Sequence, residues 1–217
     1  MAAVLLEPSL DAAFVARWIA LLDDRVTAAE ELLTRLDAAI GDADHGTNMT
    51  RGLHAARAAL ADTAPAEPAQ ACATVGGALI KAIGGASGPL FGTVFTALGR
   101  ALPPGDRIQA GDLVGALRES LRAVQRLGAA VAGDKTMIDA IAPAVAELER
   151  RFGEGMPLSA SLSAAARAAE DGALATVPMR ARKGRASYLG ARSEGHQDPG
   201  ATSSAILFQT LGAAVGE

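Results

Sequence analysis

Three aspartates near the start of the chain have a spacing that suits a cation site. Asp37 lies on an apolar helical stripe, at i+4, i+1 and i−3 relative to Leu33, Leu36 and Ile40. A buried carboxylate needs a cation, hydrogen-bond donors or a water-filled cavity. Asp42 and Asp44 follow two residues apart, and an extended turn would direct both side chains to the same side. The three carboxylates are therefore expected to converge at one helix end.

Hard oxygen ligands of this kind suit Mg²⁺, which keeps several waters and completes its octahedron with substrate phosphates. A calcium-binding EF-hand is disfavoured, because a loop starting at Asp42 would place Leu53 where the bidentate glutamate belongs. In the alternative interpretation, Asp44 or Thr47 caps the following helix and the other carboxylates are solvated. Taken alone, this segment leaves both interpretations open.

The tetrapeptide His45-Gly46-Thr47-Asn48 then opens a helix. Backbone N–H groups at the positive end of a helix bind phosphate readily. His45 is either a phosphoryl carrier, a general base or, as is more common for a lone histidine beside aspartates, a hydrogen-bonding residue.

Two further breaks contain glycines. The run Gly84 to Pro89 orders flexible glycines, a capping serine and a helix-starting proline, which predicts a second anion-accepting helix terminus or a plain helix–helix turn. The run Gly133-Asp134-Lys135-Thr136 is not a Walker motif, since Asp134 separates the glycine from the lysine and no strand precedes it. It is interpreted as a helix-opening turn in which Thr136 or Asp134 is the cap.

The longest break, Thr176 to Gly200, concentrates positive charge in an acidic chain. Arginines in such a cluster can hold phosphates through forked hydrogen bonds. The alternatives are a solvated loop or a single-stranded nucleic-acid contact, and the lone nearby aromatic, Tyr188, argues against a stacking platform. The basic residues are Arg180, Arg182, Lys183, Arg185 and Arg192.

The elements that position these breaks are predicted to be helices in a single domain spanning residues 1–217. Residues 10–40 are predicted to form one long helix or two joined ones, and β-branched and aromatic runs are sparse, which disfavours strands. About eight helices in an antiparallel, up-and-down assembly follow. The later helices are predicted at 48–61, 68–83, 89–101, 110–127, 136–150, 159–174 and 200–214.

Composition excludes several classes of protein. The net charge is −4 and the isoelectric point is about 5.4, which argues against a general nucleic-acid binder. The apolar residues 1–6 have no basic region before them and are followed by Glu7 and Pro8, so neither a signal peptide nor a membrane span is expected. The single cysteine, Cys72, suits a reducing compartment, and a cytoplasmic protein is expected.

With these residues identified, the chain resembles the ADP-binding L subunits of dihydroxyacetone kinase over nearly its whole length. The resemblance rests on four ordered motifs: GDADHGTNM at 41–49, GGASGPLFGT at 84–93, GDKTMIDA at 133–140 and KGRASYLGARSEGHQDPGATS at 183–203. It implies an all-α fold, an eight-helix antiparallel barrel with the nucleotide at one end. Related fatty-acid kinase domains commonly have threonine in place of His45, so the histidine favours the dihydroxyacetone-kinase branch.

The resemblance also assigns roles to residues. It implies ADP or ATP over two Mg²⁺ ions, with Asp37, Asp42 and Asp44 as the metal ligands. Two positions depart from the family pattern: Ala43, where glycine is frequent, and Ala191, where an acidic residue is frequent. The nucleotide contacts that it implies are His45, Gly46, Thr47, Asn48, Ala86, Ser87, Gly128, Met137, Arg185, Asp198, Pro199 and Gly200.

The implied function is phosphoryl transfer to dihydroxyacetone held on a separate K subunit, with no activity of this chain alone. A free-standing chain resembles systems in which bound ADP is rephosphorylated by a phosphoenolpyruvate-fed carrier, the M subunit. Exchangeable ATP, or a related ketose substrate, is the alternative. A nucleotide-sensing regulatory module and a phosphohistidine carrier using His45 or His196 are the other hypotheses, and neither a nucleic acid nor a membrane is expected as a partner.

Overall fold

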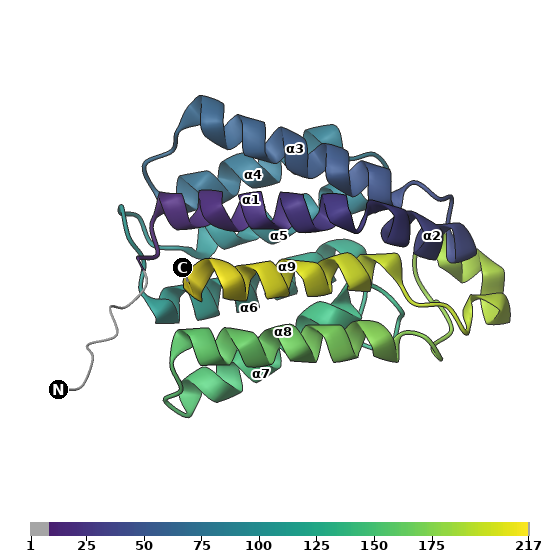
Figure 1. Ribbon diagram of the computed structural model, residues 1–217. Helices are drawn as coiled ribbons and strands as arrows, with labels where there is room; N and C mark the ends of the chain where they lie inside the picture. The colour runs from purple at the N-terminus through teal and green to yellow at the C-terminus, as the bar shows by residue number, and fades with distance from the viewer. Residues whose placement is uncertain (1–8, 217) are drawn as a thin grey trace.

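The computed structural model describes residues 9–216, and in that range the chain forms nine α-helices, one 3₁₀-helix and no strand (Figure 1). The all-α class predicted from the sequence is confirmed. The elements are α1 (Ala12–Ala28), α2 (Glu30–Ile40), α3 (His45–Thr63), α4 (Pro68–Ala82), α5 (Ser87–Ala101), α6 (Ala110–Gly128), α7 (Ile138–Gly153), α8 (Leu158–Ala175), η1 (Arg185–Ser193) and α9 (Pro199–Gly216).

The predicted helix over residues 10–40 is two joined helices. Asp11 begins α1, because its carboxylate accepts a hydrogen bond from the Phe14 amide at 2.9 Å. A single residue, Ala29, separates α1 from α2. Counting α1 and α2 as one bent unit gives the expected eight helical units.

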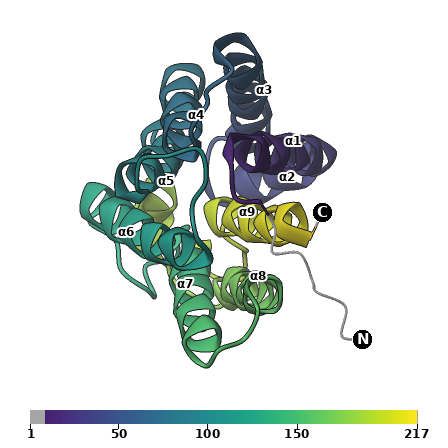
Figure 2. The ribbon, with the colours of Figure 1, turned by 90° about the vertical axis from the view of Figure 1, so that its left-hand side faces the viewer.

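The helices pack side by side in chain order and close into a ring. Each of α3 to α8 contacts the next α-helix along the chain, and α1 contacts both α3 and α9, which completes the circle (Figure 2). Short connections between antiparallel neighbours give the up-and-down order. Among the described helices, none is long and apolar enough to cross a membrane.

The interior of the ring is a continuous apolar cluster to which all nine α-helices contribute. Trp18 lies near one wall, where its ring centroid is 5.2 Å from that of Phe95 and its indole N–H donates to the Leu207 carbonyl at 3.2 Å. Small residues let some helices approach closely: a Cβ on Gly76 would lie 2.7 Å from the Gly92 carbonyl oxygen. Alanine and glycine thus serve close packing between α4 and α5.

The up-and-down order brings four breaks to one end of the ring, where α2 and η1 lie at the right of Figure 1. These are the connections α2–α3, α4–α5, α6–α7 and α8–α9. They are the four breaks that the sequence motifs occupy. The fold therefore gathers segments that are far apart in the chain.

Candidate functional site

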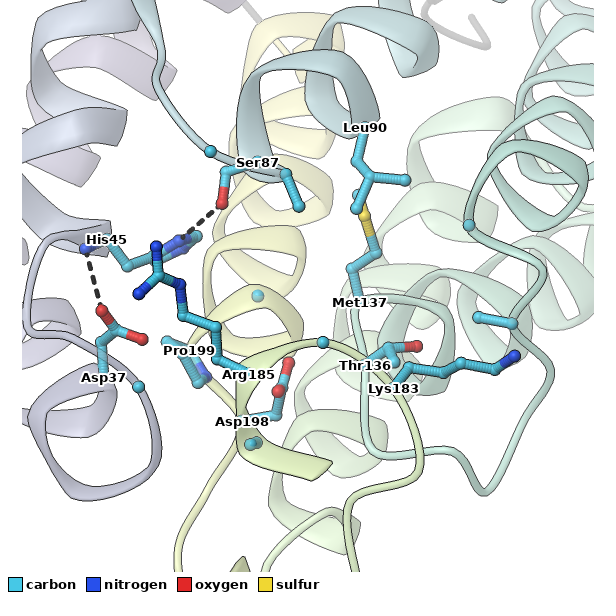
Figure 3. A pocket seen from close by; sticks show the side chains of 18 of the residues that line it. Asp37, His45, Ser87, Leu90, Thr136, Met137, Lys183, Arg185, Asp198 and Pro199 are labelled. Atoms are coloured by element: carbon cyan, nitrogen blue, oxygen red, sulfur yellow. Dashed lines mark hydrogen bonds between the residues drawn. The ribbon is translucent and has the colours of Figure 1, made fainter. Parts of the chain in front are cut away.

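A cavity of about 400 Å³ opens between these four connections. That volume lies in the usual range for a small-molecule site. Its walls include the acidic turn after α2, the start of α5, the end of α6 with the α6–α7 connection, and the segment that carries Arg185 and Asp198 (Figure 3).

The acidic turn brings its three carboxylates together. One oxygen from each of Asp37, Asp42 and Asp44 lies within 4.8 Å of the other two. Asp37 is 9% exposed, and its Oδ2 accepts hydrogen bonds from the Asp44 amide at 2.9 Å and the His45 amide at 3.2 Å. Asp44 precedes α3, but its side chain makes no capping hydrogen bond. The helix-cap interpretation therefore does not account for this carboxylate.

Two small residues shape the turn. A Cβ on Gly41 would lie 2.1 Å from Asp37 Oδ1, so only glycine leaves that carboxylate in place. Ala43 has φ of 63°, in the left-handed region that costs an L-residue about 1–2 kcal/mol. The departure from glycine noted in the sequence therefore falls at a position where glycine would be relaxed.

His45 lies behind the turn and is 5% exposed. Its Nδ1 lies 3.3 Å from the Ser87 hydroxyl, and its Nε2 lies 3.0 Å from the Ser203 hydroxyl. Burial lowers the pKa of His45, against the charges of Asp37 and Asp44, so the ring is neutral near pH 7. Hydrogen bonds at both ring nitrogens favour a hydrogen-bonding role that ties α3 to α5 and α9.

The start of α5 supplies both polar and apolar parts of the lining. Ala86 and Ser87 line the cavity, although Ser87 faces His45 and does not cap α5 as the sequence suggested. Beyond them the wall is apolar, and Figure 3 shows Leu90 and Met137 on the side away from Asp37. The larger apolar side chains of the lining, apart from the prolines, are those of Ile40, Leu90, Phe91, Val124, Leu127, Met137 and Ile138.

Gly128, the last residue of α6, lines the cavity. The α6–α7 connection that follows is ordered by Asp139, which is neither of the two predicted caps. The carboxylate of Asp139 accepts from the Thr136 amide at 2.8 Å and from the Gly133 amide. Thr136 accepts from the Ile138 amide at 3.2 Å, and Asp134 accepts from the Val131 amide at 2.9 Å. Met137 is the N-cap of α7 and no side chain makes a capping hydrogen bond there, so the prediction that Thr136 or Asp134 caps this helix is wrong.

The segment 176–200, expected to be a loop, contains η1 and covers one side of the cavity. Arg185 reaches the acidic turn, with its Nη1 2.9 Å from Asp42 Oδ2. Lys183 also lines the cavity, whereas Arg180, Arg182 and Arg192 do not. Tyr188 is 89% exposed on η1. Only part of the basic cluster therefore serves the site.

Asp198, Pro199 and Gly200 line the cavity at the start of α9. Asp198 accepts from the Ala201 amide at 2.7 Å, and Pro199 is the first residue of the helix, so both begin α9. Burial raises the pKa of Asp198 to about 7, against the Ala201 hydrogen bond and the charge of Lys135. This carboxyl is therefore poised to change charge near neutral pH.

Three residues proposed from the sequence lie outside the lining. A Cβ on Gly46 would lie 2.2 Å from the Glu30 carbonyl oxygen, so this glycine permits contact between α3 and α2. Thr47 is exposed and donates to Glu30 at 3.3 Å, and Asn48 is buried and accepts from Arg51. Their nucleotide contacts stay predictions. Of the apolar wall, sequence reasoning had assigned a nucleotide contact only to Met137, and it named Lys183 only as a member of the basic cluster. Lys135 and the other apolar lining residues were missed, because they have no local spacing signal.

Comparison with known proteins gives a consistent result. The family model of the DAK2 domain matches residues 39–213. The ADP-binding subunit DhaL of the PEP-dependent dihydroxyacetone kinase of Escherichia coli is 40% identical over 209 residues, 96% of this chain and 100% of that protein. DhaL of the PEP-dependent dihydroxyacetone kinase 1 of Listeria innocua is 39% identical over 90% of this chain and 92% of that protein.

Solved structures agree with the fold. The dihydroxyacetone kinase of C. freundii in complex with AMP-PNP and Mg²⁺ superposes with a TM-score of 0.70 at 30% identity, over 98% of this chain. This chain spans 36% of the C. freundii protein. The chain therefore belongs to the DAK2 domain family, together with the DhaL ADP-binding subunits of dihydroxyacetone kinases.

Proposed function

We propose that this chain holds an adenine nucleotide with two Mg²⁺ ions in the cavity and donates a phosphoryl group to dihydroxyacetone carried by a separate K subunit. The proposal extends to a cytoplasmic protein whose bound ADP is rephosphorylated in place by a phosphoenolpyruvate-fed M subunit. Relatives described as PEP-dependent or PTS-dependent ADP-binding subunits support this version. The observation that carries the proposal is the convergence of three carboxylates at one wall of a cavity whose opposite wall is apolar.

The residues present fit Mg²⁺. Asp37, Asp42 and Asp44 offer hard oxygen atoms close together, and Gly41 leaves room for the Asp37 carboxylate. Asp37, Asp42 and Asp44 would hold Mg²⁺, which would supply positive charge to neutralise the transferring phosphoryl group. Two ions, rather than one, are part of the proposal.

The other walls then have distinct tasks. The apolar side chains around Leu90 and Met137 would exclude water from the base and sugar. The amides at the start of α5, beside Ser87, would face phosphate oxygens, and Arg185, which pairs with Asp42, would add positive charge. Positioning and electrostatics would supply most of the catalysis, and the acceptor would be anchored on the partner subunit.

The test is native mass spectrometry of the purified chain after dialysis in Mg²⁺. We expect the wild type to retain ADP and two Mg²⁺, and Asp42→Ala to retain neither. Asp62→Ala removes an exposed carboxylate at the far end of α3 and should behave as wild type. If Asp42→Ala retains nucleotide and metal unchanged, the site assignment is wrong.

Two further measurements separate the versions of the function. Rapid loss of ADP from the wild type during dialysis would count against ADP as a resident cofactor and favour exchangeable ATP. Reconstitution with a K subunit and dihydroxyacetone tests the reaction with ATP and with the phosphoenolpyruvate relay. No triose phosphate with either donor, together with nucleotide-dependent binding of a partner, would instead support a regulatory module.

A further inference from the structure

A lysine that the proposed reaction does not use is almost wholly buried beside the cavity. Lys135 is one of three lysines in the chain and is 1% exposed. Its Nζ donates to the Thr176 carbonyl oxygen at 2.7 Å and to the His196 carbonyl oxygen. Its backbone has φ of 62°, a left-handed conformation that is strained for any residue other than glycine. A buried cation with a strained backbone requires a specific reason.

The two carbonyls belong to the two ends of the segment that covers the cavity. Thr176 directly follows α8, and His196 lies two residues before Asp198. The same two ends are joined by the Gly195 amide, which donates to the Val177 carbonyl at 2.8 Å, and by the Asp198 amide, which donates to Thr176 Oγ1 at 2.9 Å. Lys135 thus links the two ends of segment 177–198, which we call the base of this segment.

The charge of Lys135 suits this place for two reasons. The Thr176 carbonyl lies at the C-terminal end of α8, where the helix dipole favours a cation. The carboxylates of Asp198, Glu194 and Asp139 also favour the charged form, although burial lowers the pKa of Lys135 overall. A neutral side chain of the same length would leave two carbonyl groups without this donor.

Segment 177–198 carries Arg185 and leads into the Asp198 turn, which are two parts of the site. Arg185, in η1, forms an ion pair with Asp42 of the acidic turn, and Asp198 to Gly200 line the cavity where α9 begins. The Arg182 amide also donates to the Asp134 carbonyl at 3.0 Å, so a second contact joins the segment to the residue next to Lys135. Movement of the α6–α7 connection would therefore displace Arg185.

We propose that Lys135 is a positioning residue, which closes the base of segment 177–198 through the Thr176 and His196 carbonyls and thereby holds Arg185 over the cavity. This inference rests on the proposed function only in that the cavity takes a nucleotide. Lys135 would act through Arg185 and the Asp198 turn, and would not touch the transferred group.

The first experiment needs no nucleotide. Segment 177–198 contains Arg180, Arg182, Lys183, Arg185 and Arg192, all of which are tryptic sites. In Lys135→Met, which preserves length and apolar volume, we expect trypsin to cut this segment about tenfold faster or more, with circular dichroism unchanged, because the closed state loses two charge-assisted hydrogen bonds. Lys81→Met, on the exposed face of α4, is the matched control and should be cut at the wild-type rate. Cleavage of folded Lys135→Met at the wild-type rate would overturn the proposal.

The second experiment asks whether Lys135 acts through Arg185. Binding of ADP with Mg²⁺ is measured for Lys135→Met, Arg185→Ala and the double variant. We expect each single change to weaken binding about tenfold and the double variant to be little worse than either. If the affinity losses of the two single variants add in the double variant, Lys135 does not act through Arg185, and its substitution only lowers the stability of the fold.

Two controls keep the outcomes separate. If Lys135→Met does not fold, Lys135→Gln keeps an amide donor on a shorter arm and should open the segment by an intermediate amount; wild-type cleavage of this variant would overturn the proposal. If the wild-type chain fails to bind ADP with Mg²⁺, the proposed function falls, whereas the trypsin comparison still tests the bridge made by Lys135.

Discussion

The acidic turn, residues 41–44, and the segment 176–200 both line one cavity and meet at the Arg185–Asp42 ion pair, but they are held by different means. The turn is held locally: Asp37 accepts from the Asp44 and His45 amides, and Gly41 fits against the Asp37 carboxylate. The segment is held from a distance, by Lys135 and by the start of α9. The locally held turn therefore sets a fixed geometry for the metal ligands. The segment, which is held only at its two ends, can open without disturbing that geometry.

The largest effect is expected from a substitution that disturbs only the acidic turn. In Gly41→Ala the new Cβ would lie 2.1 Å from Asp37 Oδ1, so the carboxylate must move. We expect affinity for ADP with Mg²⁺, measured by calorimetry, to fall about 100-fold, as it does when metal ligands are misplaced. Trypsin should still cut segment 177–198 at the wild-type rate, since its base is untouched.

A glycine in open space provides the control for that change. A Cβ on Gly77, in α4, meets nothing within 4 Å, so Gly77→Ala should leave affinity unchanged and stabilise the helix by up to about 1 kcal/mol. Wild-type affinity in Gly41→Ala would show that the turn is not the rigid wall described above.

An intermediate effect concerns the other wall and depends on pH. The pKa of Asp198 is about 7 in the folded protein, above the ordinary value of 3.8, so the folded state binds a proton that the unfolded state releases between these values. The carboxyl therefore contributes its full stability below about pH 4, and loses it as pH rises to about 7. The loss is on the order of a few kcal/mol at most.

Asp198→Asn should remove this loss. Without metal or nucleotide, we expect the free energy of unfolding of the wild type, relative to Asp198→Asn, to fall as pH rises from about 4 to about 7. Urea denaturation at several pH values measures it, with Asp62→Asn as the control for loss of one exposed carboxyl. A difference that stays constant with pH would contradict the raised pKa.

The smallest effect is expected at Ala43 and tests whether the backbone of the acidic turn is strained. Glycine would relieve the cost of φ at 63° while adding freedom to the unfolded chain, so Ala43→Gly should gain about 0.5–1 kcal/mol of unfolding free energy. Ala58→Gly, at an exposed position inside α3, should instead lose about 1 kcal/mol. If both variants lose stability equally in urea denaturation, Ala43 is not strained.

The two walls also differ in how far the sequence could predict them. The spacing of Asp37, Asp42 and Asp44 lies within one helix end and one turn, so local periodicity predicted their convergence. The distribution of helical segments predicted an all-α, up-and-down assembly, whereas its closure into a ring was implied only by the family resemblance. The bridge from Lys135 spans 41 residues to Thr176 and 61 to His196. No local pattern carries such a contact, because it depends on how α7, α8 and α9 pack.

The same limit explains the residues whose roles were misjudged. Asp139 orders the α6–α7 connection, although Thr136 and Asp134 were the better caps by position alone. Ser87 was expected to cap α5, yet its hydroxyl lies beside His45, which comes from a different break in the chain. Side chains that can serve a local cap are taken by tertiary partners when helices meet at the same end of the ring.

The chain has one tryptophan and one tyrosine, and the fold places them in very different surroundings. Trp18 is sealed in the apolar interior against Phe95, whereas Tyr188 lies almost fully exposed on η1. Tryptophan emission should therefore report loss of the whole fold, and a probe or quencher directed to the phenol should report motion of the covering segment. The single tryptophan and the single tyrosine thus give two separate optical signals, which distinguish opening of the covering segment from unfolding of the whole chain.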